Sequence, residues 1–439
     1  MSDTPYDEHF VSWFRAVTPY INAFRGKTFV IAFGGKAVAS EFAKTLAYDV
    51  NLLVSLGIRL VLVHGARPQI EEELREKNLE SSYHRGYRVT DAETLDCVLD
   101  AVGSVYLEIE AMLSQGLPNT PMANSRIRVI GGNFITGQPI GVLDGIDMHY
   151  AGKVRKVDAE GINAQLGLGN IVLLNCEGPS PTGEIFNLQM EEAAEAVAVG
   201  IRADKLVYLT DSRGVTDPTG ALLDAMTADE VAETIKAGDW LSTDIRRYLP
   251  CAERASRAGV GRVHLIGFEQ DGALLRELFT HDGVGTVVTR ESLESIREAK
   301  PDDIGALIAL IEPMEEEGIL VHRPRELLER EIEHFSIVEH DGIIVGCAAL
   351  YSHSEEEAEL ACLAVSHEHR EWGYGEQLMK RIERRAKKAG IKRLFVLTTR
   401  TEHWFVERGF KLGSVDDLPA RKRDMYNYQR RSKVLFKTL

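Results

Sequence analysis

The chain has 439 residues, 44% of them hydrophobic and 27% charged, with a formal net charge of −16. This length suffices for two or three domains with full cores, and the acidic excess disfavours nucleic acid or an anionic membrane as the main partner. Because it has no apolar run of about 18 residues, no signal-peptide pattern and only five scattered cysteines without a C-x-x-C pair, we expect a cytoplasmic protein without a metal site.

The first predicted element is an amphipathic helix over 7–24. Its large apolar side chains recur at helical spacing, so they share one face of the helix. Such a face can pack on its own domain or on a neighbouring subunit. The residues on this face are Phe10, Trp13, Phe14, Val17 and Ile21.

Apolar strands then alternate with helices as far as residue 290. A strand at 28–33 is followed by a helix at 41–56 and a strand at 58–63, and the runs RIRVIGG, NIVLLNC, KLVYLTD and RVHLIGF read as further strands. Strands that are apolar on both faces and separated by helices indicate a mainly parallel sheet sandwiched by helices. We therefore predict an α/β domain over 1–290.

A smaller α+β pattern follows a predicted linker at 291–297 and defines a second domain over 298–439. Helices are expected at 302–312 and 325–334. The next segment, FSIVEHDGIIVGCAALYS, is typical of a hairpin that turns at Asp-Gly. The strand AELACLAVS, a long helix and the strand KRLFVLTT come after it.

Basic residues are concentrated at the end of this second domain. Residues 370–439 contain 19 Lys and Arg against 8 Asp and Glu, a net of +11, whereas the rest of the chain carries −27. A basic segment on an acidic protein suggests a local anionic ligand, although a solvated basic helix face would have the same composition.

The loop Arg370–Gly375 has the form R-x-x-G-x-G and opens the long basic helix. At the start of a helix the backbone amides have no intrahelical acceptor, and the helix dipole adds partial positive charge. Glycines at this point let a ligand approach the backbone, since a Cβ atom would block it. The loop therefore predicts an anion-binding turn.

With this loop, residues 297–439 resemble the GNAT acetyltransferases, whose signature is R/Q-x-x-G-x-G/A after a bulged strand. The resemblance implies acetyl-CoA as co-substrate, no metal, and an amide near Cys362 or Leu363 that polarises the thioester carbonyl. It implies that the pyrophosphate binds Arg370, Glu371, Trp372, Gly373, Tyr374 and Gly375. It also implies that the pantetheine arm pairs with Cys362, Leu363, Ala364 and Val365.

A catalytic base is harder to choose from the sequence. Glu359, on the strand just before the cofactor-pairing stretch, is the candidate because a carboxylate can take the proton of an attacking amine directly or through water; an exposed strand glutamate is the alternative. We expect His353, His367 and His369 to be loop surface residues. Cys362 lacks a spaced His/Asp partner for an acyl-enzyme and is expected to be a core residue.

Residues 28–290 resemble the amino acid kinase fold, through VIAFGG, LVHGARPQI, RVTDAETL, GNFIT, KLVYLTDSRGV and LLRELFTHDGVGT. Several groups that the kinases use for phosphoryl transfer are missing, and transfer depends on positioning and charge neutralisation. We therefore expect a phosphate cradle without kinase activity. The departures are Ala32 in place of a lysine, Ala66 and Arg67 in place of glycines, Glu191 in place of an aspartate after Asn187, and Lys36 beyond the glycines.

Together the two domains resemble the bacterial N-acetylglutamate synthases over the whole length. This resemblance implies acetyl transfer to L-glutamate in the first step of arginine biosynthesis, by direct attack in a ternary complex, and a homo-oligomer, expected to be a hexameric ring. It implies glutamate binding by Arg323, Arg430 and Ser432, with Arg431 or Lys433 as alternatives to Arg430. It implies regulation by arginine at Tyr20, Lys205, Glu277, Gly283 and Gly285, although Glu277 could be an ordinary exposed helix carboxylate.

Several alternatives stay open at the level of sequence. The chain could be a bifunctional synthase/kinase, a non-catalytic arginine-sensing protein, or an acetyltransferase that acts on another amino acid or on a protein lysine. Ala32 disfavours the first and the intact glycine turn disfavours the second. The acid that protonates the leaving thiolate could be Tyr426, Tyr428 or water.

Overall fold

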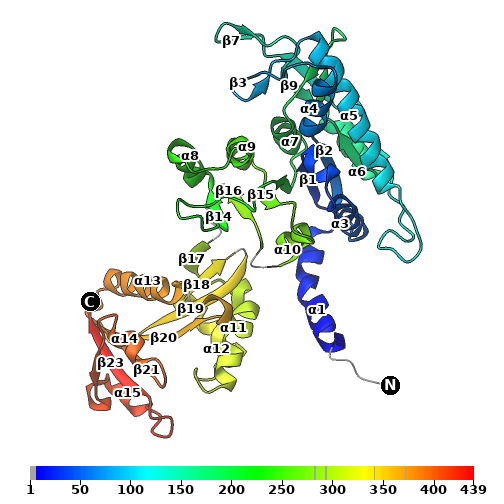
Figure 1. Cartoon of the computed structure of the whole chain (residues 1–439). Helices are drawn as coiled ribbons and strands as arrows, with labels where there is room; N and C mark the ends of the chain where they lie inside the picture. Colours follow the sequence, from blue (N-terminus) through cyan, green and yellow to red (C-terminus); the bar gives the residue numbers. More distant parts are fainter. Residues whose placement is uncertain (1–5, 281–282, 292–293, 341, 371) are drawn as a thin grey trace. The chain divides into compact units, whose positions relative to one another are not determined.

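The chain folds into two compact units, residues 1–291 and residues 292–439, each with its own sheet (Figure 1). The computed structural model describes residues 6–280, 283–291, 294–340, 342–370 and 372–439. None of the helices in these ranges has the length and apolar character that crossing a membrane requires.

Unit 1 contains an eight-stranded sheet in the order β14-β16-β15-β13-β1-β2-β10-β5, in which β15 and β16 are antiparallel and every other described pairing is parallel. This confirms the predicted mainly parallel sheet. The strands are β1 Thr28–Phe33, β2 Arg59–His64, β5 Val129–Ile130, β10 Ile171–Leu174, β13 Lys205–Thr210, β14 Ala225–Thr227, β15 Arg262–Gly267 and β16 Thr286–Thr289.

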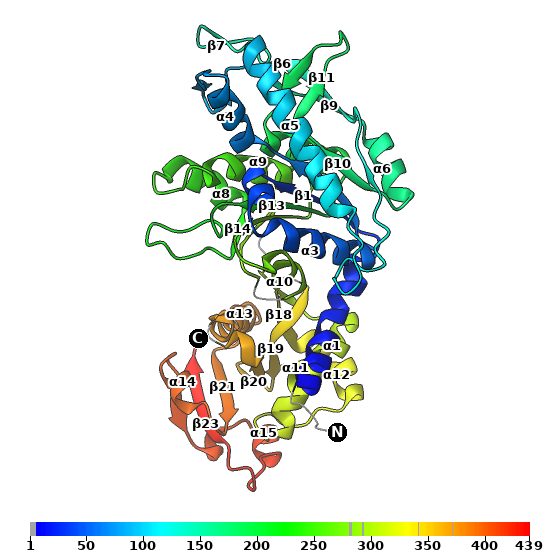
Figure 2. The same ribbon diagram turned by 45° about the vertical axis from the view of Figure 1, so that its right-hand side comes forward.

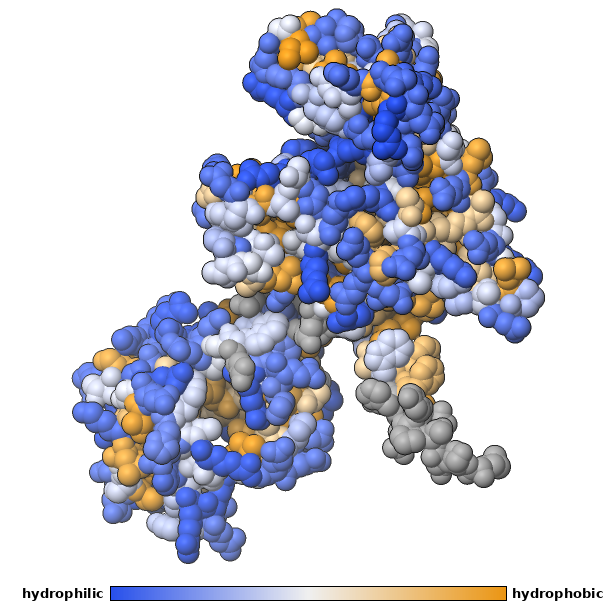
Figure 3. All heavy atoms as spheres, in the orientation of Figure 1, coloured by the Kyte–Doolittle hydropathy of each residue, from blue (hydrophilic) through white to orange (hydrophobic). Residues whose placement is uncertain are grey.

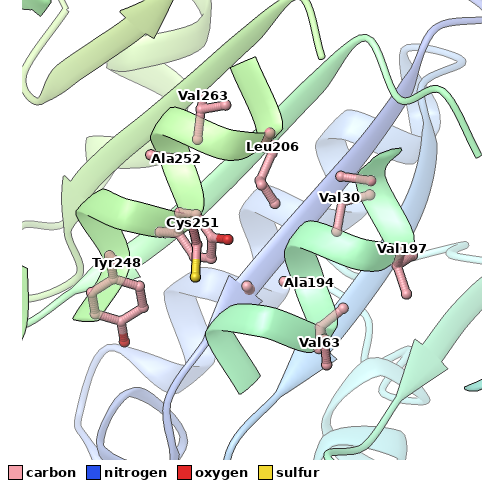
Figure 4. Packing of buried hydrophobic residues seen from close by; sticks show 14 of the residues in the cluster. Val30, Val63, Ala194, Val197, Leu206, Tyr248, Cys251, Ala252 and Val263 are labelled. Carbon is pink, nitrogen blue, oxygen red and sulfur yellow. The ribbon is translucent and has the colours of Figure 1, made fainter. Parts of the chain in front are cut away.

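Helices cover both faces of this sheet because alternate residues of each strand are apolar on both sides. One layer consists of α6 Ala159–Gly167, α7 Met190–Gly200, α8 Ala228–Ala237 and α9 Ile245–Arg257. Figure 4 shows side chains of α7 and α9, among them Ala194 and Cys251, packed beside strand residues such as Val30. The other layer consists of α1 Tyr6–Phe24, α2 Gly35–Ala39, α3 Ala43–Ser55, α4 Arg67–Glu76, α5 Ala92–Leu113 and α10 Ala273–Phe279.

The described residues of unit 1 also form four small two-stranded antiparallel sheets. They are β3 Tyr83–His84 with β4 Tyr87–Arg88, β6 Ile135–Pro139 with β9 Gly152–Val157, β7 Val142–Leu143 with β8 Ile146–Asp147, and β11 Glu177–Pro179 with β12 Ile185–Asn187.

Unit 2 contains a seven-stranded sheet in the order β17-β18-β19-β20-β21-β23-β22, in which only β20 and β21 are parallel among the described pairings (Figure 2). The segment 291–297, expected to be a linker, includes the first residues of β17. The strands are β17 Glu294–Glu298, β18 Phe335–His340, β19 Ile343–Ser352, β20 Glu357–Val365, β21 Arg393–Thr398, β22 Lys411–Gly413 and β23 Lys433–Thr438.

The long helix α13 packs on one face of this second sheet, while α11 and α12 pack on the other. Both faces are therefore buried, as the smaller predicted α+β domain requires. The helices are α11 Ile304–Glu316, α12 Arg325–Glu331, α13 Tyr374–Lys388, α14 Glu402–Val406 and α15 Ala420–Asp424, with short 3₁₀ turns at Pro301–Asp303, Ile332–His334, His367–His369 and Val415–Asp417.

Candidate functional site

Strands β20 and β21 separate after a short paired stretch. Their pairing runs only from Glu357 opposite Arg393 to Glu359 opposite Phe395, although β20 continues to Val365. Beyond Glu359, the β20 backbone therefore has no strand partner on the β21 side in the described structure. An open strand edge of this kind can pair with an extended ligand through main-chain hydrogen bonds.

A β-bulge lies within this open edge. The register with β19 passes from Ala361 opposite Ala349 to Ala364 opposite Cys347, so β20 has one extra residue at this point. Cys362 has a φ of +50°, which few residues other than glycine adopt. Because a bulge redirects the backbone locally, the amides of Cys362 and Leu363 are the ones released from regular pairing.

The predicted anion-binding turn opens helix α13. Gly373 is the N-cap at φ +78°, and no side chain caps the helix. A Cβ atom on Gly375 would lie 3.3 Å from the Trp404 ring, so the turn packs closely. Arg370 and Trp372 are exposed, whereas Tyr374 is buried and its hydroxyl lies 2.9 Å from His340 Nδ1. The predicted member Glu371 lies outside the described residues.

Glu359 lies where β20 and β21 separate and is only 7% exposed, so the alternative of an exposed strand glutamate is wrong. Its Oε2 is 2.6 Å from Lys422 Nζ and 3.3 Å from His353 Nε2. Burial alone would raise the pKa of Glu359, but the hydrogen bond from His353 and the charge of Lys422 outweigh burial and lower it. The carboxylate is therefore held ionised.

Two histidines differ from the prediction of loop surface residues. His353 is half-buried against Glu359, and the His369 ring is only 3% exposed, with Nδ1 2.6 Å from Ser366 Oγ. His367 is exposed as expected. Both corrections depend on contacts formed when the strands and loops pack together, which local polarity in the sequence does not indicate.

Arg323 and Arg430 come together from distant parts of unit 2. The Arg430 guanidinium donates to the carbonyls of Gly318 and Ile319, and the Arg323 amide donates to Glu315 at 3.0 Å. Burial and the nearby charge of Arg323 both lower the pKa of Arg430. Arg323 and Arg430 repel each other and are partly buried, so a ligand with negative charge would be bound favourably between them.

Arg323 also lies near the bulge at Cys362. The hydrogen bond with the Cys347 thiol and the charge of Arg323 lower the pKa of Cys362. The Cys362 side chain itself is 5% exposed and packs in the core between β20 and α11, as expected. Only its backbone is thus available to a ligand.

The residues close to Arg430 in the sequence differ in burial and in their contacts. Ser432 is buried, and the Tyr426 hydroxyl donates to its carbonyl at 2.6 Å. Arg431 is exposed, and Lys433 is held in an ion pair with Glu402. Tyr428 is 70% exposed and lies edge-on to the Tyr426 ring.

The residues that the family resemblance assigns to arginine form a second cluster, in unit 1. Glu277 Oε2 accepts hydrogen bonds from the amides of Val284 and Gly285 at 2.7 and 2.9 Å, and its Oε1 lies 2.7 Å from His264 Nδ1. His264 Nε2 is 3.2 Å from Lys205 Nζ. Glu277 is 6% exposed, so the alternative of an exposed helix carboxylate is wrong.

The pKa values of Glu277 and Lys205 in this cluster are strongly shifted. Burial would raise the pKa of Glu277, but His264 and the two amides lower it to about 2, while burial lowers that of Lys205 to about 7. Glycine suits position 283, because φ is +57° and a Cβ atom would lie 2.7 Å from the Glu277 carboxylate. Tyr20 is half-buried on α1, and the Lys205 ammonium lies 5.0 Å from the ring of Phe24 on the same helix.

Sequence reasoning missed His264, although a histidine within the apolar strand RVHLIG was a signal of a partnered polar group. It also missed Lys422, for which the sequence carries no comparable signal. The described residues include no group of three or more metal-ligating side chains suited to an ion.

Unit 1 shows the surroundings of the residues that differ from the kinase pattern. Ala32 is fully buried within β1, and Lys36 forms an ion pair with Asp211 at 2.7 Å. Asn187 donates to Thr90, and Glu191 pairs with Arg247. The first glycine pair and Gly65 still lie close together at the ends of β1 and β2.

Comparison with known proteins gives a match in each unit. The amino acid kinase family model matches residues 27–267, and the acetyltransferase (GNAT) family model matches residues 304–410. An amino-acid acetyltransferase from Ralstonia nicotianae is 50% identical over 437 residues, covering 99% of this chain and 97% of that protein.

Solved structures match this chain over nearly its whole length. N-acetylglutamate synthase from Neisseria gonorrhoeae, complexed with coenzyme A and L-arginine, has a TM-score of 0.90 at 42% identity and covers 98% of this chain and 99% of its own. The complex of the same enzyme with coenzyme A and N-acetyl-glutamate has a TM-score of 0.63 at the same identity and coverage.

Proposed function

We propose, from the premise that this chain belongs to the family of amino-acid acetyltransferases, that its amino-acid substrate is L-glutamate. The enzyme transfers the acetyl group of acetyl-CoA to the α-amine and releases CoA. Glutamate carries two carboxylates, and the observation that carries the proposal is the convergence of Arg323 and Arg430 beside the open edge of β20.

Coenzyme A binding follows from the same geometry. The uncapped start of α13 at Gly373 presents amides and positive dipole to the diphosphate, and the edge of β20 beyond Glu359 presents main-chain groups to the pantetheine amides. The bulge at Cys362 directs an amide toward the thioester oxygen, where negative charge develops during attack.

Glu359 serves as the general base in this scheme. The amine of glutamate loses a proton to the carboxylate, directly or through water, and its nitrogen forms a bond to the acetyl carbon. The C–S bond then breaks, and the thiolate of CoA takes a proton from Tyr426, Tyr428 or water. Transfer is direct, since the Cys362 side chain lies in the core and no other nucleophile is needed.

Unit 1 would regulate this activity by binding arginine at the Lys205–Glu277 cluster. The ionised Glu277 carboxylate is a suitable partner for a guanidinium, and Gly283 and Gly285 keep the backbone close to it. The N. gonorrhoeae relative is complexed with L-arginine, which supports the assignment of the effector.

Helix α1 would contribute to a ring-shaped hexamer. Phe10, Trp13 and Phe14 are between 53% and 59% exposed, and Figure 3 shows hydrophobic residues on the exposed surface of this helix. A row of exposed aromatic residues is typical of an interaction site. Light scattering on the full-length chain should give six subunits, and Trp13→Glu should shift the population to smaller species.

Initial rates of CoA release, measured with acetyl-CoA and glutamate both varied, test the catalytic proposal. Direct transfer in a ternary complex predicts intersecting double-reciprocal lines. Parallel lines would indicate an acetylated enzyme and contradict the scheme, and equal or faster turnover with another amino acid would contradict the substrate.

A further inference from the structure

Tyr351 lies on the same face of the second sheet as the proposed base, yet the proposed scheme gives it no role. The register of β19 and β20 places it directly opposite Glu359. Residues directly opposite each other in an antiparallel pair have side chains on the same side of the sheet. The Tyr351 ring is half-buried against the apolar cluster that also contains Cys362. Its phenol is therefore part of the surface on which the substrate is proposed to bind.

The Tyr351 hydroxyl connects two charged side chains. It donates to Glu331 Oε2 at 2.9 Å, and the Arg323 guanidinium is its second hydrogen-bond partner. Burial raises the pKa of Tyr351, and the positive charge of Arg323 only partly opposes this rise. The phenol therefore stays protonated at neutral pH, so it can donate to the carboxylate while its oxygen accepts from the guanidinium.

The same tyrosine holds both ends of helix α12. Arg323 comes shortly before the first residue of this helix, and Glu331 is its last residue. In the 3₁₀ turn that follows, the centroid of the His334 ring lies 5.0 Å from that of the Tyr351 ring. The start and the end of α12 are thus both tied to β19 through one side chain.

Arg323 is held from its own loop as well. Its amide donates to Glu315 Oε1 at 3.0 Å, and its Nη1 donates to the Val321 carbonyl at 2.9 Å. An arginine side chain has several rotatable bonds, and ordering it when a ligand binds costs entropy. Because Val321 and Tyr351 contact the guanidinium from the loop and from the sheet, it is ordered before a ligand arrives.

We propose that Tyr351 is a positioning residue for substrate recognition: supported by Glu331, its hydroxyl holds the Arg323 guanidinium in the orientation that binds a carboxylate of the substrate. The inference rests on the proposed function, in which that substrate is glutamate, and it adds the group that fixes one of the two arginines. In this role the hydroxyl contacts neither the amine nor the acetyl group. Tyr351 therefore contributes to substrate binding and leaves the chemical step to Glu359.

Steady-state kinetics of the full-length chain, with glutamate and acetyl-CoA varied in turn, test this role. Tyr351→Phe removes only the hydroxyl and keeps the ring against His334, so the KM for glutamate should rise about 10-fold. The kcat and the KM for acetyl-CoA should each change by less than about twofold, as expected when binding alone is weakened. Melting curves of the variant and the wild type are compared to detect any loss of the fold.

Glu331→Gln provides a second variant that does not alter the sheet. Its amide oxygen can still accept from the Tyr351 hydroxyl but carries no charge, so the hydrogen bond is weaker and the KM for glutamate should rise about threefold. Glu329→Gln is the matched control, because Glu329 is exposed on the same helix and pairs with Arg325 at 2.8 Å. Equal effects of the two substitutions would exclude a specific contribution of Glu331.

A double-mutant cycle with Arg323→Ala shows whether Tyr351 acts through the guanidinium. Tyr351→Phe should lower kcat/KM for glutamate about 10-fold when Arg323 is present and leave it unchanged in Arg323→Ala, since no guanidinium is then left to position. The value of kcat/KM is taken from the linear rise of rate with glutamate below KM, which can be measured even for variants that bind weakly.

Two results would overturn the positioning role alone. A fall in kcat with an unchanged KM for glutamate would place the hydroxyl in the chemical step, and an equal loss with and without Arg323 would mean that Tyr351 acts on another group. Normal glutamate kinetics in Tyr351→Phe would likewise exclude the role while the proposed function stands. If the wild-type chain does not acetylate glutamate, the substrate assignment fails, and the role proposed for Tyr351 fails with it.

Discussion

Both units carry a glycine turn after a buried strand, but the two turns have different surroundings. In unit 1 the pair Gly34-Gly35 leads into a helix of only five residues, and the nearby Lys36 is neutralised by Asp211. In unit 2 the turn at Gly373 opens a helix of 15 residues and lies near the end of β20, whose edge is open beyond Glu359.

The comparison shows that a glycine turn indicates only that backbone can approach a ligand. Whether chemistry follows depends on the charged groups that surround the turn. Unit 2 keeps an ionised, buried carboxylate at Glu359 and the two arginines near the bulge. Unit 1 instead pairs charges near its glycine turn with each other, Lys36 with Asp211 and Arg247 with Glu191.

The largest effect should come from removing the carboxylate that distinguishes unit 2. Glu359→Gln keeps the shape of the side chain but cannot accept a proton, so kcat should fall about 100-fold or more with little change in KM. Glu357→Gln, two residues earlier on the same strand and paired with Arg393, is the control. An unchanged kcat in Glu359→Gln would remove its assigned role.

The next largest effect concerns the two arginines proposed to bind glutamate. Arg430→Ala should raise the KM for glutamate about 10- to 100-fold, the loss expected for charge-assisted hydrogen bonds, while the Kd for coenzyme A stays the same. Arg431→Ala changes the exposed neighbour and should have no effect on either constant. Equal loss in both variants would mean that a general reduction of charge, and no specific contact, is responsible.

A smaller effect should appear in the pH profile. Lys422 helps to lower the pKa of Glu359, so Lys422→Met should raise that pKa. Because the base acts in its ionised form, the acidic limb of the kcat/KM profile should move to higher pH, while the plateau at high pH is kept. Arg423→Met, an exposed change on the same short helix, should leave the limb in place. A limb that moves to lower pH would contradict the pairing.

The smallest effect on basal turnover is expected in unit 1. Glu277→Gln removes the buried charge proposed to meet a guanidinium, so the response of activity to added arginine should be lost or shifted at least 10-fold, with kcat unchanged in its absence. Glu233→Gln, exposed on α8, is the control. An unaltered arginine response would exclude this cluster as the effector site.

Periodicity predicted the elements well where apolar patterns are local. The expected strand at 28–33 has the bounds of β1, and the expected strand at 58–63 differs from β2 by one residue. The helix expected at 41–56 corresponds to α3, but the five-residue helix α2 just before it was missed. The Ser40 hydroxyl donates to the Ala37 carbonyl at the end of α2 and so separates the two helices.

The site partners could not be predicted in the same way because they are brought together only by tertiary packing. Lys422 reaches Glu359 from a helix 63 positions later, and His264 joins Lys205 to Glu277 across neighbouring elements. The position of Glu359 before the cofactor-pairing stretch and the motif around Glu277 pointed to these two carboxylates, but neither indicated what holds them ionised. Long-range electrostatic contacts of this kind leave no periodic trace in a sequence.

A crystal structure of the full-length chain with coenzyme A would test the central comparison most directly. The account predicts the diphosphate on the amides at Gly373–Gly375 and the pantetheine arm along β20 beyond Glu359. Coenzyme A bound instead at the glycine pair Gly34-Gly35 of unit 1, or a turn at Gly373 that stays empty at saturating ligand, would contradict it.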